Sequence, residues 1–167
     1  MRTIRIKGTR PRTHPFPIIS WLIRLITWSR ISHVVIDFNS NIIFHANFNK
    51  LEFLDSNNFF ESVYTIYDFV IPLSDKQYYA ILSKCQKLSG IQKGYFAHLI
   101  GVALSLPFRL LNIHFRNYIA EHYNSYTCSM LVTELLKEHT NVNILKDSNI
   151  YIENITEKDV VSYLNTL

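Results

Sequence analysis

The chain has 167 residues, of which 48% are hydrophobic and 18% are charged, and it contains two cysteines. A chain of this length buries about two-thirds of its unfolded surface, so we expect a single domain over residues 1–167. Two cysteines exclude a disulfide scaffold, and the sequence has no internal repeats or low-complexity tracts.

The formal net charge of +4 is unevenly distributed along the chain. Residues 1–36 carry +7 and the remainder carries −3, because the first acidic residue is Asp37. We predict a basic N-terminal arm at about residues 1–16, which would bind an acidic partner or a membrane surface. Nucleic acid is disfavoured as a partner, because the rest of the chain has no basic stripe with interleaved aromatic residues and no zinc-finger spacing.

No segment of the sequence resembles a signal peptide or a transmembrane helix. Two apolar segments, 18–27 and 99–111, are short and interrupted by charge or proline. We interpret both as packed core helices, although either could touch a bilayer surface. The expected location is therefore the cytoplasm or the inside of a particle.

Hydrophobic periodicity and capping residues divide the chain into strands and helices. The predicted elements are a strand at 3–7, a helix at 18–28, a hairpin formed by 33–38 and 42–46, an irregular segment at 52–60, a strand at 63–71 ended by Pro72, a helix at 75–88 capped by Ser74, a helix at 94–105, a helix from Cys128 to Lys137, a strand near 150–153 and a helix at 157–164 capped by Thr156. This pattern predicts an α+β fold, with a small antiparallel sheet curved as a half-barrel and helices on one side.

Cys128 is the first candidate functional residue, because it lies where a polar stretch turns into the helix 128–137. The residues that could cap this helix are Asn124, Ser125 and Thr127. A thiol in a first helical turn lies near unpaired N–H groups and the positive end of the dipole, which lower its pKa. The alternative is a small buried hydrophobe, the usual role of a free cysteine, and we expect that role for Cys85.

His33 and His45 lie on the two strands of the predicted hairpin, with Asn39-Ser40-Asn41 between them. A turn centred on residue 39 or 40 makes the two histidines direct or diagonal cross-strand neighbours on one face. A general base and the group that orients it could stand there. The alternative is a pair of polar side chains on a solvated strand face.

Three stretches resemble one family: residues 28–36 (WSRISHVVI), residues 44–46 (FHA) and residues 126–132 (YTCSMLV). They are similar to the circularly permuted, YiiX-like branch of the NlpC-type papain-like superfamily, which is related to lecithin:retinol acyltransferase-like proteins. The resemblance implies a permuted papain-like fold with the nucleophile at a helix N-terminus. It also implies Cys128 as nucleophile, His33 as general base and His45 as the residue that orients His33. The chain departs from the family in Met130, where Cys-Ser-Glu is usual, and in lacking glycines near the histidine strand.

The activity that the resemblance implies is a cysteine peptidase or amidase. It would cleave amide or isopeptide bonds in a peptide, peptidoglycan or a protein conjugate through an acyl-enzyme, without cofactor or metal. Such a chain from a bacterium or a phage would act in the bacterial cytoplasm or travel with a virion.

Three alternatives to this activity remain open. The same triad could serve an acyltransferase, thioesterase or lipase that acts on lipid acyl groups. The chain could also be a non-catalytic module that binds a partner through its basic arm, or His33, His45 and Cys128 could hold zinc. Tyr95 could line the substrate pocket, but a core tyrosine is the simpler interpretation.

Overall fold

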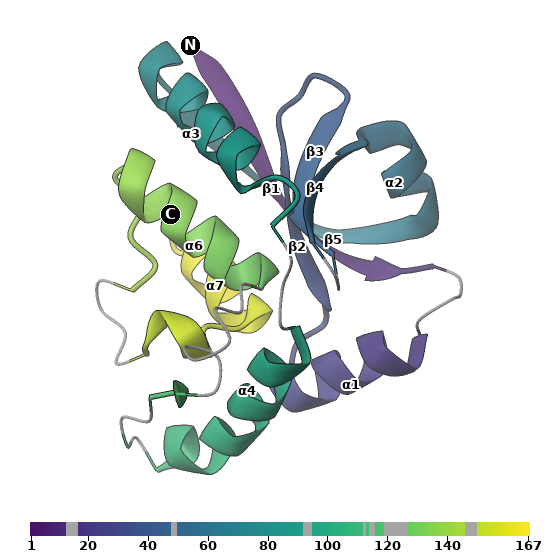
Figure 1. The fold of residues 1–167 in the computed structure, drawn as a ribbon, viewed down its shortest axis with the longest axis vertical. Coiled ribbons are helices and arrows are strands. Elements are labelled where there is room, and N and C mark those ends of the chain that lie inside the picture. Colours follow the sequence, from purple (N-terminus) through teal and green to yellow (C-terminus); the bar gives the residue numbers. More distant parts are fainter. Residues whose placement is uncertain are drawn as a thin grey trace.

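The structure is a computed structural model that describes residues 1–12, 17–47, 50–91, 95–111, 113, 116–118, 127–145 and 150–167 (Figure 1). The strands are β1 (Arg2–Pro11), β2 (His33–Asp37), β3 (Ile42–Ala46), β4 (Leu51–Asp55) and β5 (Val63–Leu73). The helices are α1 (Pro17–Thr27), α2 (Ser56–Ser62), α3 (Asp75–Leu88), α4 (Tyr95–Leu110), α6 (Cys128–His139) and α7 (Glu157–Leu164), with a short 3-10 helix η1 (Ile152–Asn154). The five strands form one antiparallel sheet in the order β4-β3-β2-β1-β5.

The prediction of a basic N-terminal arm is wrong for residues 2–11. These residues form β1, which lies between β2 and β5 in the sheet. The alternation of this segment explains the placement: Ile4 and Ile6 are each 1% exposed, whereas Arg5 and Lys7, which alternate with them, point to the other face. Lys7 forms a partly buried ion pair with Asp37 at 2.7 Å, and Arg5 pairs with a carboxylate of β5. Several positive charges of the segment are therefore neutralised within the domain.

The sheet is strongly curved, because a short helix connects its two edge strands. The helix α2 has seven residues and so spans about 10 Å. Five strands laid flat would place their outer members about 19 Å apart. The sheet must therefore curl to bring β4 and β5 within the reach of α2, and Figure 1 shows this curl.

Helices cover both faces of the sheet, so the prediction of helices on one side is only partly confirmed. The helices α3, α6 and α7 bury one face and share with it a core that includes Val34, Ile36, Phe44 and Leu131. The helix α2 lies on the other side of the sheet (Figure 1). This second layer contains Phe59, which lies close to the side chains of His33 and His45.

Local signals placed several boundaries correctly. The hairpin of β2 and β3 turns through Asn39 and Asn41, whose φ angles of 55° and 58° are ones that asparagine tolerates better than most residues. The helix α3 begins after Ser74, which forms a capping box with the side chain of Gln77. The helix α7 begins after Thr156 in the same way.

Several predictions of secondary structure are wrong. The helix predicted at 94–105 does not stop before Pro107 but continues through it to Leu110. Residues 52–60 are not irregular: they belong to β4 and to α2, which Asp55 caps by accepting a hydrogen bond from the N–H of Asn58. The strand expected near 150–153 is replaced by η1. Pro72 does not end β5, because β5 is an edge strand and an edge position tolerates a residue without an N–H group.

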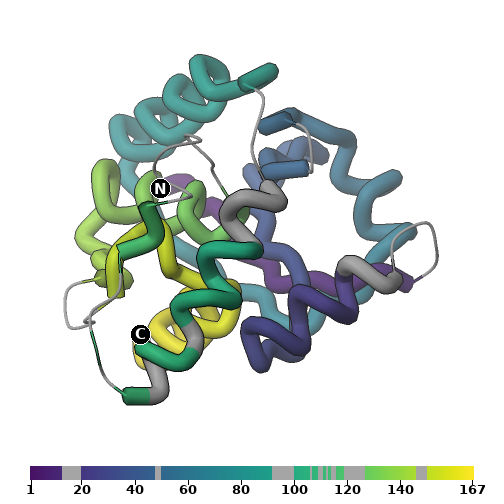
Figure 2. Tube along the Cα trace, turned by 60° about the horizontal axis from the view of Figure 1, so that its bottom comes forward, coloured from purple at the N-terminus to yellow at the C-terminus, as the bar shows by residue number. Residues whose placement is uncertain are grey.

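The two apolar helices α1 and α4 are not fully enclosed, contrary to our interpretation of them as core. Each buries one side, represented by Ile23 and Val102, and exposes large apolar side chains on the other. Figure 2 shows α4 running beside α1 at one end of the molecule. The exposed residues of this end are Trp21, Leu22, Leu25, Trp28, Ile100, Leu104, Phe108 and Leu111.

Candidate active site

Cys128 is the first residue of α6, as the polar-to-apolar transition predicts. Thr127 caps the helix by accepting a hydrogen bond from the N–H of Met130 at 3.3 Å. Asn124 and Ser125, the other expected caps, lie outside the described residues. The apolar face of α6, including Leu131 and Leu135, packs against the sheet. This packing places Cys128 in the interior of the domain, where the residue is 0% exposed.

The thiol of Cys128 donates a hydrogen bond to the carboxyl group of Glu157, with 3.3 Å between Sγ and Oε1. Glu157 is the first residue of α7 and is 5% exposed. Burial, followed by the nearby carboxylate, raises the pKa of the Cys128 thiol well above its usual value. Burial likewise raises the pKa of Glu157 to about 7. The expectation that the helix N-terminus would lower the pKa of this thiol is therefore wrong for this conformation, because burial outweighs the helix dipole.

The two predicted histidines meet as expected. The register of β2 and β3, in which Ile36 pairs with Phe44, makes His33 and His45 diagonal neighbours on one face. Nε2 of His33 lies 2.9 Å from Nδ1 of His45, and the two rings meet edge to face. Phe59 of α2 packs against both rings and partly shields this hydrogen bond from water.

Glu52 extends this pair on the next strand. In the register of β3 and β4 it stands directly opposite His45, and its Oε1 lies 3.7 Å from Nε2 of His45. Lys50 and Asn47 also contact the Glu52 carboxylate, each at 2.9 Å. Against the effect of burial, these neighbours lower the pKa of Glu52, so the group facing His45 is a carboxylate.

The arrangement favours one tautomer in each ring. Burial lowers the pKa of His33 to about 3 and that of His45 to about 4, so both rings are neutral at pH 7. A carboxylate near Nε2 of His45 favours a proton on that atom, which leaves Nδ1 as an acceptor. His33 then donates from Nε2, and its own Nδ1 carries a free electron pair.

The thiol and the histidine pair approach the same part of the sheet from opposite faces. Strand alternation directs His33 and His45 to the α2 side, whereas Cys128 belongs to the core on the α6 side. Within the described residues the structure joins Cys128 to Glu157 and joins the histidines to each other, and it shows no hydrogen bond between Cys128 and either histidine.

The backbone hydrogen bonding between β2 and β3 ends near the Cys128 thiol and the histidine pair. Phe38 donates its N–H to β3, and the alternation of ladder bonds directs the N–H of Val34 to the same side. The register between β2 and β3 ends at Ile36, so Val34 lies beyond it. There the backbone of Val34 acts on the Cys128 thiol and lowers its pKa, against the larger effect of burial. The thiol of Cys128 thus contacts the backbone of the residue that follows His33 in the chain.

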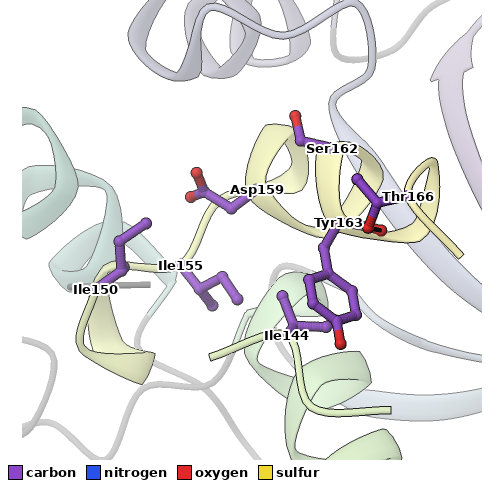
Figure 3. Close-up of a pocket in the computed structure, with 7 residues that line it drawn as sticks. All are labelled: Ile144, Ile150, Ile155, Asp159, Ser162, Tyr163 and Thr166. Atoms are coloured by element: carbon purple, nitrogen blue, oxygen red, sulfur yellow. Dashed lines mark hydrogen bonds between the residues drawn. The ribbon is translucent and has the colours of Figure 1, made fainter. Parts of the chain in front are cut away.

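Other candidate sites lie elsewhere or are not supported. A cavity of about 350 Å³ is lined by residues of α7 and the preceding segment, among them Asp159 and Tyr163, and not by the predicted triad (Figure 3). In the part of the chain that the structure describes, no cluster of three or more His, Cys, Asp or Glu residues could hold a metal ion.

Cys85 is 0% exposed within α3, and burial raises the pKa of its thiol to about 12, which confirms its expected place in the core. The side chain of Tyr95 lies outside the described residues.

Comparison of the chain with family models, with curated proteins and with solved structures found no match. The described helices also include none long and apolar enough to cross a bilayer.

Two residues of the candidate site were not anticipated from the sequence. Glu157 lies 29 positions after Cys128, in a helix whose N-terminal carboxylate is ordinary for a first turn. Glu52 fell in a segment interpreted as irregular. Its signal becomes visible only once residues 51–55 are recognised as a third strand that pairs with β3.

Proposed function

We propose that the protein is a cysteine hydrolase of amide or isopeptide bonds, with Cys128 as nucleophile, His33 as general base and His45 as the residue that positions His33. The observation that carries this proposal is the 2.9 Å hydrogen bond between His33 and His45, next to the strand residue whose backbone contacts the thiol. The resemblance of the three short sequence stretches supports the same roles. The substrate class would be a peptide, peptidoglycan or a protein conjugate.

The described geometry corresponds to a resting state in this proposal. The thiol is protonated and turned toward Glu157, so no thiolate–imidazolium pair exists before substrate binds. Activity therefore requires Sγ of Cys128 to leave Glu157 and reach Nδ1 of His33 past the end of the ladder between β2 and β3. A general base that acts only during attack is consistent with a neutral His33.

The proposed reaction then follows the chemistry of an acyl-enzyme. Nδ1 of His33 accepts the thiol proton as Sγ of Cys128 attacks the carbonyl carbon. The backbone N–H of Cys128, at the start of α6, stabilises the oxyanion. His33 returns the proton to the departing amine, and water, activated by the same nitrogen, hydrolyses the thioester. His45 stabilises the imidazolium of His33 while that proton is held.

Alkylation kinetics test the proposal directly, because Cys85 is an internal control. We expect a peptidyl electrophile, such as a vinyl sulfone, to label Cys128 at least about tenfold faster than Cys85 in the folded protein. The variant His33→Ala should lower the labelling rate of Cys128 about 100-fold or more, the usual contribution of a general base. The variant Cys85→Ser should leave that rate unchanged, and circular dichroism should show that all variants are folded.

A second candidate is a non-catalytic module, and the complete burial of the Cys128 thiol favours it. This candidate predicts equally slow labelling of Cys128 and Cys85, with no effect of His33→Ala. That outcome would refute the hydrolase proposal. If Cys128 is labelled rapidly, mass analysis of the enzyme after incubation with muropeptides or with phospholipids distinguishes an amidase from an enzyme that transfers lipid acyl groups.

A further inference from the structure

The outer side of α1 is apolar although it faces solvent. Trp21 is 54% exposed, Leu25 is 54% exposed and Trp28, just beyond the helix, is 76% exposed. These residues are four and three positions apart and so form one stripe along the helix. The opposite side of α1 contains Ile23 and Thr27, which are buried against the rest of the domain.

The neighbouring helix α4 likewise exposes apolar side chains on one side and buries the other. Ile100 and Leu104 of α4 and Leu111, just beyond it, are between 52% and 69% exposed, whereas Val102 and Ser105 are buried. The two helices pack against each other at one end of the molecule (Figures 1 and 2). We define the α1/α4 face as Trp21, Leu25, Trp28, Ile100, Leu104 and Leu111.

The segments that carry the α1/α4 face contain cations and no carboxylates. Residues 1–36 and residues 76–120 include no aspartate or glutamate, and α1 ends near Arg24 and the exposed Arg30. An exposed apolar face beside positive charge complements a surface that is both apolar and anionic.

We propose that the α1/α4 face docks on the surface of an anionic phospholipid bilayer, without spanning it. The two exposed tryptophans, Trp21 on α1 and Trp28 just after it, suit the boundary between headgroups and acyl chains, where the indole ring is preferred. Exposed indole rings can insert into a fluid bilayer without a matching groove. A protein partner would need a groove of complementary shape to bind them. A second copy of this chain is disfavoured, because its own α1/α4 face would bring cations against cations. The proposal does not depend on the chemistry of Cys128.

The test uses the two tryptophans of the chain, Trp21 and Trp28, which both belong to the proposed face. Vesicles of phosphatidylcholine with phosphatidylglycerol should shift the tryptophan emission to shorter wavelength and sediment the protein. Vesicles of phosphatidylcholine alone should bind it much more weakly. Replacing Arg24 and Arg30 with glutamine should reduce the affinity for anionic vesicles about fivefold for each lost cation.

A double variant distinguishes vesicle binding through the α1/α4 face from nonspecific hydrophobic binding. Leu25→Glu with Leu104→Glu places carboxylates in the face and should abolish vesicle binding. The control Val70→Glu makes the same type of change at a 53% exposed apolar residue of β5 and should bind as the wild type does. Unchanged emission with anionic vesicles, or equal loss of binding in both variants, would overturn the proposal. So would a dimer in gel filtration that only the double variant disrupts, because the face would then bind a second copy.

Discussion

Replacing Glu157 with glutamine should make the protein more stable at alkaline pH and leave it unchanged at acid pH. Glu157 is buried, and its pKa in the folded chain is about 7 instead of the ordinary 4.5. The folded state therefore holds a proton between these values that the unfolded state has lost, so stability falls as the pH rises from 4.5 through 7. One pKa unit corresponds to about 1.4 kcal/mol, so above pH 7 the charged carboxylate costs about 3 kcal/mol.

Glutamine keeps the shape of Glu157 and an oxygen that accepts a hydrogen bond from the Cys128 thiol, but it cannot ionise. Urea denaturation of the wild type and of Glu157→Gln, measured from pH 4 to pH 8, should give curves that coincide at the acid end. At pH 8 the variant should be more stable by about 3 kcal/mol. Glu61→Gln, an exposed change on α2, is the matched control. Equal stability of Glu157→Gln and wild type at pH 8, or the same gain in Glu61→Gln, would refute the reasoning.

Two further predictions concern packing and the histidine pair. Gly101→Ala should destabilise the domain by about 1–3 kcal/mol in thermal or chemical denaturation, because a Cβ at this position overlaps the buried side chain of Asn117; a variant as stable as the wild type would show that this close approach does not exist. Nuclear magnetic resonance should show no titration midpoint for His33 or His45 between pH 8 and pH 5, because burial lowers their pKa values to about 3 and about 4. A midpoint near 6.5 for either ring would place it in water.

The sequence predicted the parts of the fold that local chemistry determines. The helices α3 and α7 begin directly after the capping residues Ser74 and Thr156, as predicted, and the parity of His33 and His45 predicted their contact. These predictions succeeded because each depends on residues close together in the chain or on one short turn. The overall α+β class followed from the same elements.

The predictions that failed concern relations between distant segments. The thiol of Cys128 is controlled by Glu157, which a different helix supplies, so its pKa could not be inferred from the dipole of α6 alone. The charges near the N-terminus suggested an arm, but Ile4 and Ile6 take that segment into the sheet. The apolar patterns of α1 and α4 predict that one face of each helix is buried in the domain. They do not predict whether the opposite apolar face is buried or exposed to solvent.

The position of β1 between β2 and β5 has a consequence for synthesis on the ribosome. Its two partners follow it in the chain, and β5 is the last strand of the sheet to be made. Until β5 emerges, one edge of β1 exposes unpaired backbone groups next to apolar side chains, a state that favours pairing between nascent chains. We therefore expect the yield of folded protein to depend on how quickly translation proceeds from β2 to β5, and chaperones that bind extended segments should help most in this interval.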